Sequence, residues 1–309
     1  MADLLSQEKE KWRYFVDVAV WPRRSSFDPL GWMENFSVAD QPMAIRLLSG
    51  FVYYSHDHVQ QMFRSSFLNL SQITLTTKSN YVTAKIDWAR FIANLLVVRV
   101  TGENPSDADS GYAFVRHARD TLMIEEEQLC TPEKAIEELV SGQRESILFA
   151  DDFVGSGEQF CKMWERPYEV GKTGRKASLR DIAAIAGDRI KFYYCPVICT
   201  SVGLARIRRD CPKVRVCPAH VLSSKHSAIS PDAVIWKNFE TVKGAGSTFV
   251  ERVSRAAGIP DLNGGVGCWR GFNKLGLSLA FAHGWPDATL PLFYWNENGW
   301  KPLLRKGAL

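Results

Sequence analysis

Residues 147–159 are Ile-Leu-Phe-Ala-Asp-Asp-Phe-Val-Gly-Ser-Gly-Glu-Gln. The apolar run at 147–150 is long enough for a strand that is buried on both faces of a parallel sheet. Ligands bind beyond the carboxyl ends of such strands, and that is where Asp151 and Asp152 stand. The stretch therefore predicts an α/β protein with a ligand site at the end of a central strand.

The small residues that follow favour an anionic ligand. Gly155, Ser156 and Gly157 let the backbone approach a ligand closely, and a helix starting near Ser156 would direct unpaired N–H groups toward an anion. Two adjacent carboxylates cannot hold a phosphate, so we expect them to bind hydroxyl groups or a divalent cation beside it. The alternative is a plain helix-capping turn. We disfavour that alternative because two carboxylates ending an apolar strand are costly to bury.

This stretch resembles the ribose-phosphate loop of type I phosphoribosyltransferases. Their pattern is an apolar strand, Asp/Glu-Asp, three variable residues, Thr/Ser, Gly, any residue and Thr/Ser; Asp151, Asp152, Ser156 and Gly157 match it. The resemblance implies that the two aspartates are catalytic and bind the ribose 2′- and 3′-hydroxyls. It also implies that the following loop binds the ribose and its 5′-phosphate through Phe153, Val154, Gly155, Ser156, Gly157, Glu158 and Gln159. Gln159 departs from the usual hydroxyl residue, although its amide can still donate to phosphate. For Glu158, a solvated position in the first helical turn, stabilised by the helix dipole, is favoured over a role as a catalytic base.

A narrower resemblance is to the phosphoribosyltransferase-like effectors of bacterial conflict and antiphage systems, the PRTase-CE family. It rests on residues 151–159 and on two flanking stretches, 47–55 and 286–295. It implies a cytosolic defence effector that acts on a nucleotide or a phosphoribosyl pyrophosphate-like ligand. Mg²⁺ would balance the phosphate charge and would bind to the protein through Asp151 and Asp152. The resemblance also implies control by a partner protein, such as a retron reverse transcriptase with its non-coding RNA.

Further candidates follow other predicted strands. Residues 95–101 form the first predicted core strand, and in phosphoribosyltransferases the loop after that strand binds pyrophosphate. The resemblance therefore adds Thr101, Gly102, Ser110 and Gly111 as candidates, with loop capping as the alternative because the loop also carries acidic residues.

Residues 192–200 form a second predicted central strand. Parallel strands bring their carboxyl ends to one edge, so Thr200, Ser201 and Gly203 should lie at the same edge as Asp152. His283, at a predicted strand end, is a last candidate, with a structural role as the alternative.

The order of segments predicts three parts. Residues 1–94 have helical apolar spacing, 95–260 form a phosphoribosyltransferase-like, Rossmann-like α/β core, and 261–309 form an extension that packs on the core with two short strands at 278–283 and 290–295. No two-stranded flap is predicted between residues 111 and 144. Cleavage of a glycosidic bond by water is therefore as open as true transfer.

Composition excludes several classes of protein. A net charge of +4 over 309 residues is far from the basic surface of a dedicated nucleic-acid binder. No apolar stretch reaches a membrane span, and no leader precedes the first helix, so we expect a cytoplasmic protein. The seven cysteines are expected to be reduced. Cys195 and Cys199 sit about 13 Å apart on a strand, too far to chelate one zinc ion.

Three functions from different classes stay open. The first is an enzyme that attacks the anomeric carbon of a phosphoribosyl compound. The second is a silent sensor or scaffold that uses the same cradle only to bind a nucleotide. A third, nucleic-acid binding through basic segments, predicts strongly salt-dependent retention on DNA or RNA.

Overall fold

A computed structural model describes residues 2–22, 26–75, 80–102, 119–120, 122, 124–142, 144–171, 174–237 and 245–305. The chain divides into two compact units. One unit joins residues 1–59 to residues 222–309, and the other consists of residues 60–221. These boundaries differ from the predicted ones at 94/95 and 260/261, because the two ends of the chain build one unit together.

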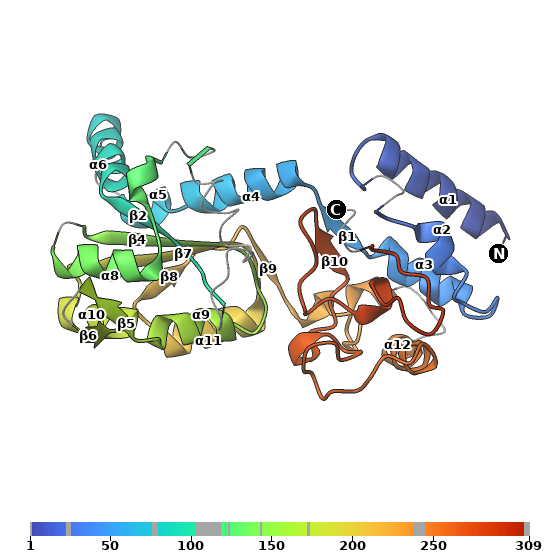
Figure 1. Ribbon diagram of the computed structural model, residues 1–309. Helices are drawn as coiled ribbons and strands as arrows, with labels where there is room; N and C mark the ends of the chain where they lie inside the picture. The colour runs from blue at the N-terminus through green and yellow to red at the C-terminus, as the bar shows by residue number, and fades with distance from the viewer. Residues whose placement is uncertain are drawn as a thin grey trace. The chain divides into compact units, whose positions relative to one another are not determined.

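The unit of residues 60–221 is built around a six-stranded sheet (Figure 1). Its strands are β2 (Leu95–Arg99), β3 (Leu129–Cys130), β4 (Ser146–Val154), β7 (Lys191–Thr200), β8 (Val214–Val216) and β9 (His220–Leu222). The order is β3-β2-β4-β7-β8, with every neighbouring pair parallel, and β9 also pairs with β7. The predicted α/β fold with a parallel sheet is confirmed.

The strand order identifies one edge of the sheet as a ligand site. Numbered by appearance, the five strands of the main path run 2-1-3-4-5, which is a doubly wound order. In such sheets the order reverses between the first and third strands, here β2 and β4, and ligands bind outside their carboxyl ends. Those ends are Arg99 and Val154.

Helices cover both faces of this sheet (Figure 1). The first group is α4 (His56–Leu68), inside which the unit boundary falls, α5 (Ser71–Thr74) and α6 (Tyr81–Ala93). The second is α8 (Pro132–Val140), α9 (Glu158–Glu165), α10 (Leu179–Ala186) and α11 (Ser201–Asp210). Phe91 of α6 contacts Tyr193 edge-on, whereas Phe160 of α9 stacks on Tyr194 at 4.2 Å. Adjacent tyrosines of β7 thus serve opposite faces, as strand geometry requires.

Local signals fix the helices of the second group. Thr131 caps α8 by accepting a bond from the Lys134 N–H, and Pro132 occupies its first turn. Ser178 and Asp181 form a reciprocal capping box at the start of α10. A short 3₁₀ turn, η1 (Glu126–Gln128), precedes β3.

A two-stranded antiparallel hairpin follows the motif rather than preceding it. It consists of β5 (Tyr168–Val170) and β6 (Arg175–Ala177). The Gly171 N–H donates to Glu137 of α8 at 2.9 Å. The sequence did not predict this hairpin, because each of its strands is only three residues long, too short for a period to be recognised.

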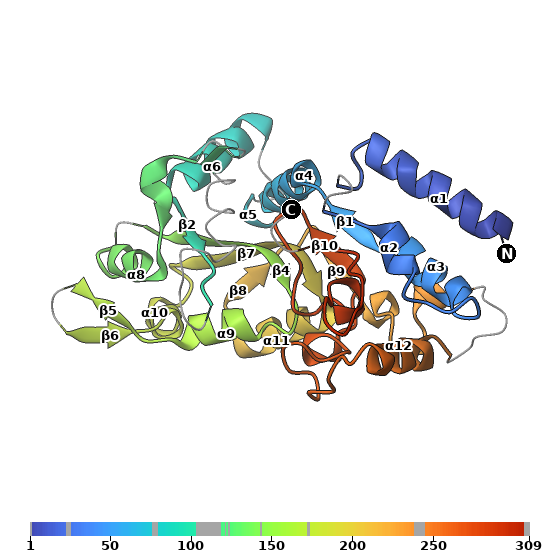
Figure 2. The ribbon, with the colours of Figure 1, turned by 45° about the vertical axis from the view of Figure 1, so that its right-hand side comes forward.

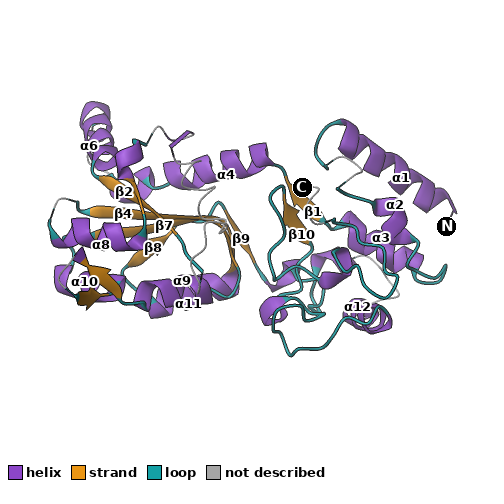
Figure 3. Cartoon of the chain, in the orientation of Figure 1, coloured by secondary structure: helices purple, strands orange, loops and turns teal. Residues whose placement is uncertain are grey.

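The unit of residues 1–59 and 222–309 has an aromatic core and long loops (Figure 3). Its helices are α1 (Ala2–Asp17), α2 (Pro29–Met33), α3 (Gln41–Ser49), the start of α4, and α12 (Ala245–Ala256). Its 3₁₀ turns are η3 (Ser224–His226), η4 (Val234–Trp236), η5 (Phe272–Lys274) and η6 (Pro291–Phe293). The two chain segments meet in a parallel pair between β1 (Val52–Tyr54) and β10 (Leu279–Phe281).

Two predictions for this unit were wrong. The region 1–94 was predicted as helical, but β1 lies within it, because the Val-Tyr-Tyr run gains a strand partner only from residues 279–281. Residues 290–295 were predicted as a strand but contain η6. Pro291, which has no N–H for a strand ladder, sits in its first turn, and the N–H of Trp295 bonds back to the Pro291 carbonyl.

Among the residues described, no helix combines the length and the apolar character that crossing a bilayer requires.

Candidate functional site

Asp151 lies near the end of β4 and is buried, with 5% of its surface exposed. Its Oδ2 accepts a hydrogen bond of 2.7 Å from the hydroxyl of Tyr194 on the neighbouring strand β7. Its Oδ1 accepts the backbone N–H of Asp152 at 3.0 Å. Both carboxyl oxygens of Asp151 therefore already have donors from the protein.

Burial also controls the protonation of this carboxyl. Desolvation raises the pKa of Asp151 well above its usual value, and the neighbouring Asp152 carboxylate raises it further. Burial likewise raises the pKa of Tyr194, and the charge of Asp151 adds to that effect. The pair thus holds its protons to higher pH than free side chains would.

Asp152 differs from Asp151 in exposure. Asp152 and Phe153 are both half-buried, and Val154 is buried against the core. Asp152 is therefore the member of the carboxylate pair that a ligand reaches first. A half-exposed carboxylate is suited to accept hydrogen bonds from hydroxyl groups.

The loop at 155–157 is fixed by close backbone contacts. Gly157 has φ of +75° and is the N-terminal cap residue of α9. A Cβ at Gly157 would lie 2.8 Å from the carbonyl oxygen of Gly203, and a Cβ at Gly203 would overlap the carbonyl of Gly155. Glycine is required at both positions because two backbones meet there.

Thr200 joins this loop to α11. Its hydroxyl donates to the Gly155 carbonyl and accepts the Gly203 N–H at 3.0 Å, which makes Thr200 the cap of α11. Ser201 follows it and is exposed. The sequence placed Thr200 and Gly203 at the edge where β4 ends, and the structure brings both into contact with the 155–157 loop.

The first turn of α9 is held by a hydroxyl group and by ion pairs. The buried hydroxyl of Ser156 accepts the Glu158 N–H at 3.3 Å. The Glu158 carboxylate pairs with Lys162 at 2.8 Å and with Arg206 at 3.5 Å. Hydrogen bonding to Lys162 lowers the pKa of Glu158, with Arg206 assisting. Glu158 is thus held ionised by two cations, while Gln159 is exposed.

The candidates after β2 lie in a different setting. Thr101 is buried, and its backbone N–H points to the sulfur of Met163. Arg166, the residue that ends α9, donates to the Gly102 carbonyl at 2.7 Å and to the Thr101 hydroxyl at 3.4 Å. Ser110 and Gly111 fall outside the described residues.

His283 belongs to the other compact unit. It is exposed, and its ring stacks on Phe281 at 5.3 Å.

Sequence reasoning missed two residues at this edge. Tyr194 was treated only as part of an apolar strand, although a tyrosine on the adjacent strand is the type of residue that can donate to a buried aspartate. Arg99 ends β2 and pairs in register with Ala150, the residue before Asp151. Its Nε and Nη1 atoms are buried. One arginine in the otherwise apolar run 95–100 was a signal that the sequence offered.

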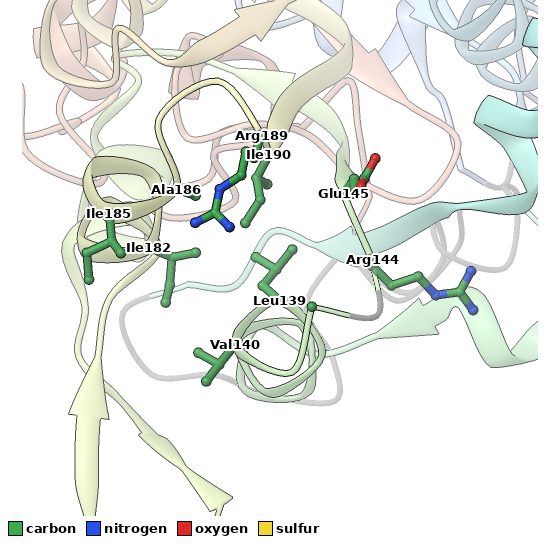
Figure 4. Close-up of a pocket in the computed structure, with 10 residues that line it drawn as sticks. Leu139, Val140, Arg144, Glu145, Ile182, Ile185, Ala186, Arg189 and Ile190 are labelled. Atoms are coloured by element: carbon green, nitrogen blue, oxygen red, sulfur yellow. The ribbon is translucent and has the colours of Figure 1, made fainter.

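A cavity of about 350 Å³ lies at the opposite edge of the sheet. Its lining includes Glu145, just before β4, and Ile190, just before β7. Leu139 of α8 and Ile182 of α10 face one another across it (Figure 4). Because ligands of doubly wound sheets bind at the carboxyl edge, we do not assign this cavity to the candidate site.

Comparison with known proteins identifies the family. A family model described as PRTase-CE matches residues 29–306. The chain belongs to the PRTase-CE family. The match extends over parts of both compact units, so the PRTase-CE assignment applies to residues 60–221 and also to the unit formed by the two ends of the chain. No curated protein and no solved structure matches the chain.

The fit of Mg²⁺ to the PRTase-CE motif depends on which aspartate is considered. Asp151 fits poorly, because both its oxygens accept hydrogen bonds and burial favours its neutral form. Asp152 fits better, because Mg²⁺ is commonly held by one or two carboxylates together with substrate phosphates. Within the described ranges, no group of three or more His, Cys, Asp or Glu side chains is placed to hold a metal ion.

Proposed function

We propose that this phosphoribosyltransferase-like protein binds a nucleotide or phosphoribosyl compound at the carboxyl edge of β4. Asp152 would accept hydrogen bonds from the ribose hydroxyls, and the 155–159 loop would surround the 5′-phosphate. The observation that carries the proposal is the position of Asp152. It stands half-exposed at the strand-order reversal, two residues before β4 ends and the loop of small residues leads into a helix.

The loop supplies the anion-binding part of the site. The first N–H groups of a helix have no partners within the helix, and the helix dipole favours negative charge there. Gly157, the cap residue of α9, has no side chain that could bond to these groups, although the Glu158 N–H of that turn donates to the Ser156 hydroxyl.

Arg99 adds a cation to the same edge. It ends β2, and its register partner Ala150 precedes Asp151 on β4. A guanidinium can form two parallel hydrogen bonds to a phosphate or pyrophosphate group. We propose that Arg99 contributes to binding of the phosphate-bearing part of the ligand.

Asp151 holds the neighbouring backbone of the site in place. Its hydrogen bond to Tyr194 ties β4 to β7, and its contact with the Asp152 backbone N–H fixes the chain at the pair. In this proposal Asp151 positions Asp152 rather than contacting the ribose itself. This changes the equal roles that the family motif implies for the two aspartates.

The proposed reaction is attack at the anomeric carbon of the ribose. An acceptor oxygen or nitrogen, or the oxygen of water, forms the new bond to that carbon. The bond from that carbon to the base nitrogen or to the pyrophosphate oxygen breaks, its electron pair leaves with the base or pyrophosphate, and the attacking group releases its proton to the solvent or to the leaving group. Asp152 would hold Mg²⁺, which when bound would neutralise the charge of the phosphate.

The test is product analysis with matched variants. Purified protein is incubated with a nucleotide mixture and with phosphoribosyl pyrophosphate, and products are identified by mass spectrometry. Free base, ribose phosphate or pyrophosphate should form with the wild-type protein and be lost in Asp152→Asn. Glu145→Gln, which changes an exposed carboxylate at the other end of β4, is the control and should retain turnover. Equal turnover by Asp152→Asn would contradict the proposed role.

A binding-only function is the alternative that one observation favours. Asp151 is buried and hydrogen-bonded, and Glu158 is paired with two cations. Asp152 is half-exposed near the end of β4, where a ligand can reach it. A sensor needs no second acid or base. Tight nucleotide binding without any product would support the sensor over the enzyme.

We propose bacterial antiphage defence in the cytoplasm as the setting, with control by a partner protein or by a reverse transcriptase–RNA complex. Family membership supports this setting. Co-purification of the tagged chain from its native host, with and without phage infection, tests it. Recovery of the chain alone under both conditions would contradict control by a stable partner.

A further inference from the structure

Two thiols meet where α9 packs against α11. The Sγ atoms of Cys161 and Cys211 lie 3.7 Å from each other, although the two residues are separated by 50 positions in the sequence. Cys161 is in the middle of α9, and Cys211 is the residue that ends α11. Figures 1 and 2 show the two helices side by side on the same face of the sheet. This contact has no part in the proposed ligand binding.

Apolar packing alone would account for buried cysteines. Four of the seven described cysteines, Cys130, Cys195, Cys199 and Cys268, fit that account, and Cys217 is half-buried; none of these five forms a hydrogen bond to a second thiol. Cys161 and Cys211 differ because their sulfurs face each other. Sulfurs at this separation must approach by about 1.7 Å to form a disulfide.

The two thiols are not equivalent. Cys161 is 6% exposed, whereas Cys211 is fully buried. The hydrogen bond from Cys211 lowers the pKa of Cys161, although burial and the Asp210 carboxylate oppose this effect. The same contact raises the pKa of Cys211. The thiolate is the reactive form of cysteine, so Cys161 is the thiol expected to react first.

We propose that Cys161 and Cys211 are an oxidation site that forms a reversible disulfide, with a peroxide as the oxidant. The Cys161 thiolate attacks one peroxide oxygen, the O–O bond breaks, and Cys161 becomes a sulfenic acid while the other oxygen leaves as water. The Cys211 sulfur then attacks the Cys161 sulfur, and the S–O bond breaks to release a second water. Two thiols are oxidised by two electrons in total, and one hydrogen peroxide is reduced to two waters.

The disulfide would fasten two helices that both support the candidate loop. Gly157 immediately precedes α9, and it contacts Gly203 in the first turn of α11. A covalent link between the helices would restrict their relative motion below this contact. The effect on the loop rests on the proposed function, whereas formation of the disulfide does not.

The direct test is peptide mapping of the full-length wild-type chain after treatment with hydrogen peroxide. Non-reducing digestion and mass spectrometry should give a peptide pair joined through Cys161 and Cys211. Free thiols should fall from seven to five per chain and return to seven with dithiothreitol. Retention of all seven thiols, or oxidation of Cys161 to sulfinic acid with no linked peptide, would overturn the proposal.

Variants locate the effect. Cys161→Ser and Cys211→Ser should each abolish the linked peptide, while Cys130→Ser, at a buried thiol on β3 in the same unit, should leave it unchanged. Because the mapping uses the wild-type chain, a variant that fails to fold does not remove the test. Hydrogen exchange of residues 155–165 should slow on oxidation without any ligand present. Unchanged exchange with a confirmed disulfide would overturn the coupling to the loop and leave the proposed ligand site untouched.

Discussion

The hydroxyl of Tyr194 donates a 2.7 Å hydrogen bond to Oδ2 of Asp151, and this bond joins β7 to β4 inside the core. Tyr194→Phe should therefore destabilise the protein by about 1–3 kcal/mol, because a buried carboxyl loses a donor. Urea unfolding measures the change. Tyr193→Phe is the matched control on the opposite face of β7, and it should cost clearly less. Equal losses for the two variants would show that the Asp151 bond is not special.

The raised pKa of Asp151 makes stability depend on pH. Its folded-state pKa is above the value of about 3.9 in the unfolded chain, so the folded protein holds this proton more tightly. The stabilisation from this group is full below about pH 3.9 and is lost as pH rises through the folded-state value. Asp151→Asn, which cannot ionise, should gain stability relative to the wild type between pH 4 and pH 8. Unfolding free energies at both pH values test this, and a constant difference would contradict it.

Gly157 combines a positive φ with a backbone contact. Gly157→Ala should cost stability through both the strained φ and the 2.8 Å approach to the Gly203 carbonyl. Gly142→Ala isolates the first effect, because Gly142 has φ of +73° and nothing within 4 Å of its Cβ position. We expect Gly142→Ala to cost about 1 kcal/mol and Gly157→Ala clearly more. Similar unfolding midpoints for the two variants would rule out the tight contact.

Arg99 is expected to bind the phosphate-bearing part of the ligand. Arg99→Lys keeps the charge but loses paired hydrogen bonding, and Arg99→Met loses both. Affinity for phosphoribosyl pyrophosphate should fall about tenfold or more in Arg99→Met and less in Arg99→Lys, as measured by calorimetry. Circular dichroism checks the fold of each variant. Unchanged affinity in Arg99→Met would remove Arg99 from the site.

The sequence predicted the features that depend on local pattern. The apolar runs at 95–101, 147–150 and 192–200 correspond to β2, β4 and β7, and the edge shared by Thr200 and the 155–157 loop follows from parallel strands. Pairings between distant segments were not predictable in this way. β1 exists only because residues 279–281 pair with it, and residues 1–59 form one compact unit with residues 222–309.

Burial is the other property that the sequence could not supply. Asp151 and Asp152 are identical in the sequence, yet one is buried under Tyr194 and the other is half-exposed. That difference depends on where α9 and β7 pack, and no local pattern encodes it. Arg99 and Tyr194 were missed for the same reason, since each matters through a neighbouring strand.

The most direct measurement is the affinity of ribose 5-phosphate and phosphoribosyl pyrophosphate for three forms of the full-length chain, determined by isothermal titration calorimetry. The wild type and Glu145→Gln should bind with equal affinity. Asp152→Asn should bind at least about tenfold more weakly, which corresponds to roughly 1.4 kcal/mol. Binding by Asp152→Asn as tight as that of the wild type would contradict a ribose-phosphate site at the end of β4.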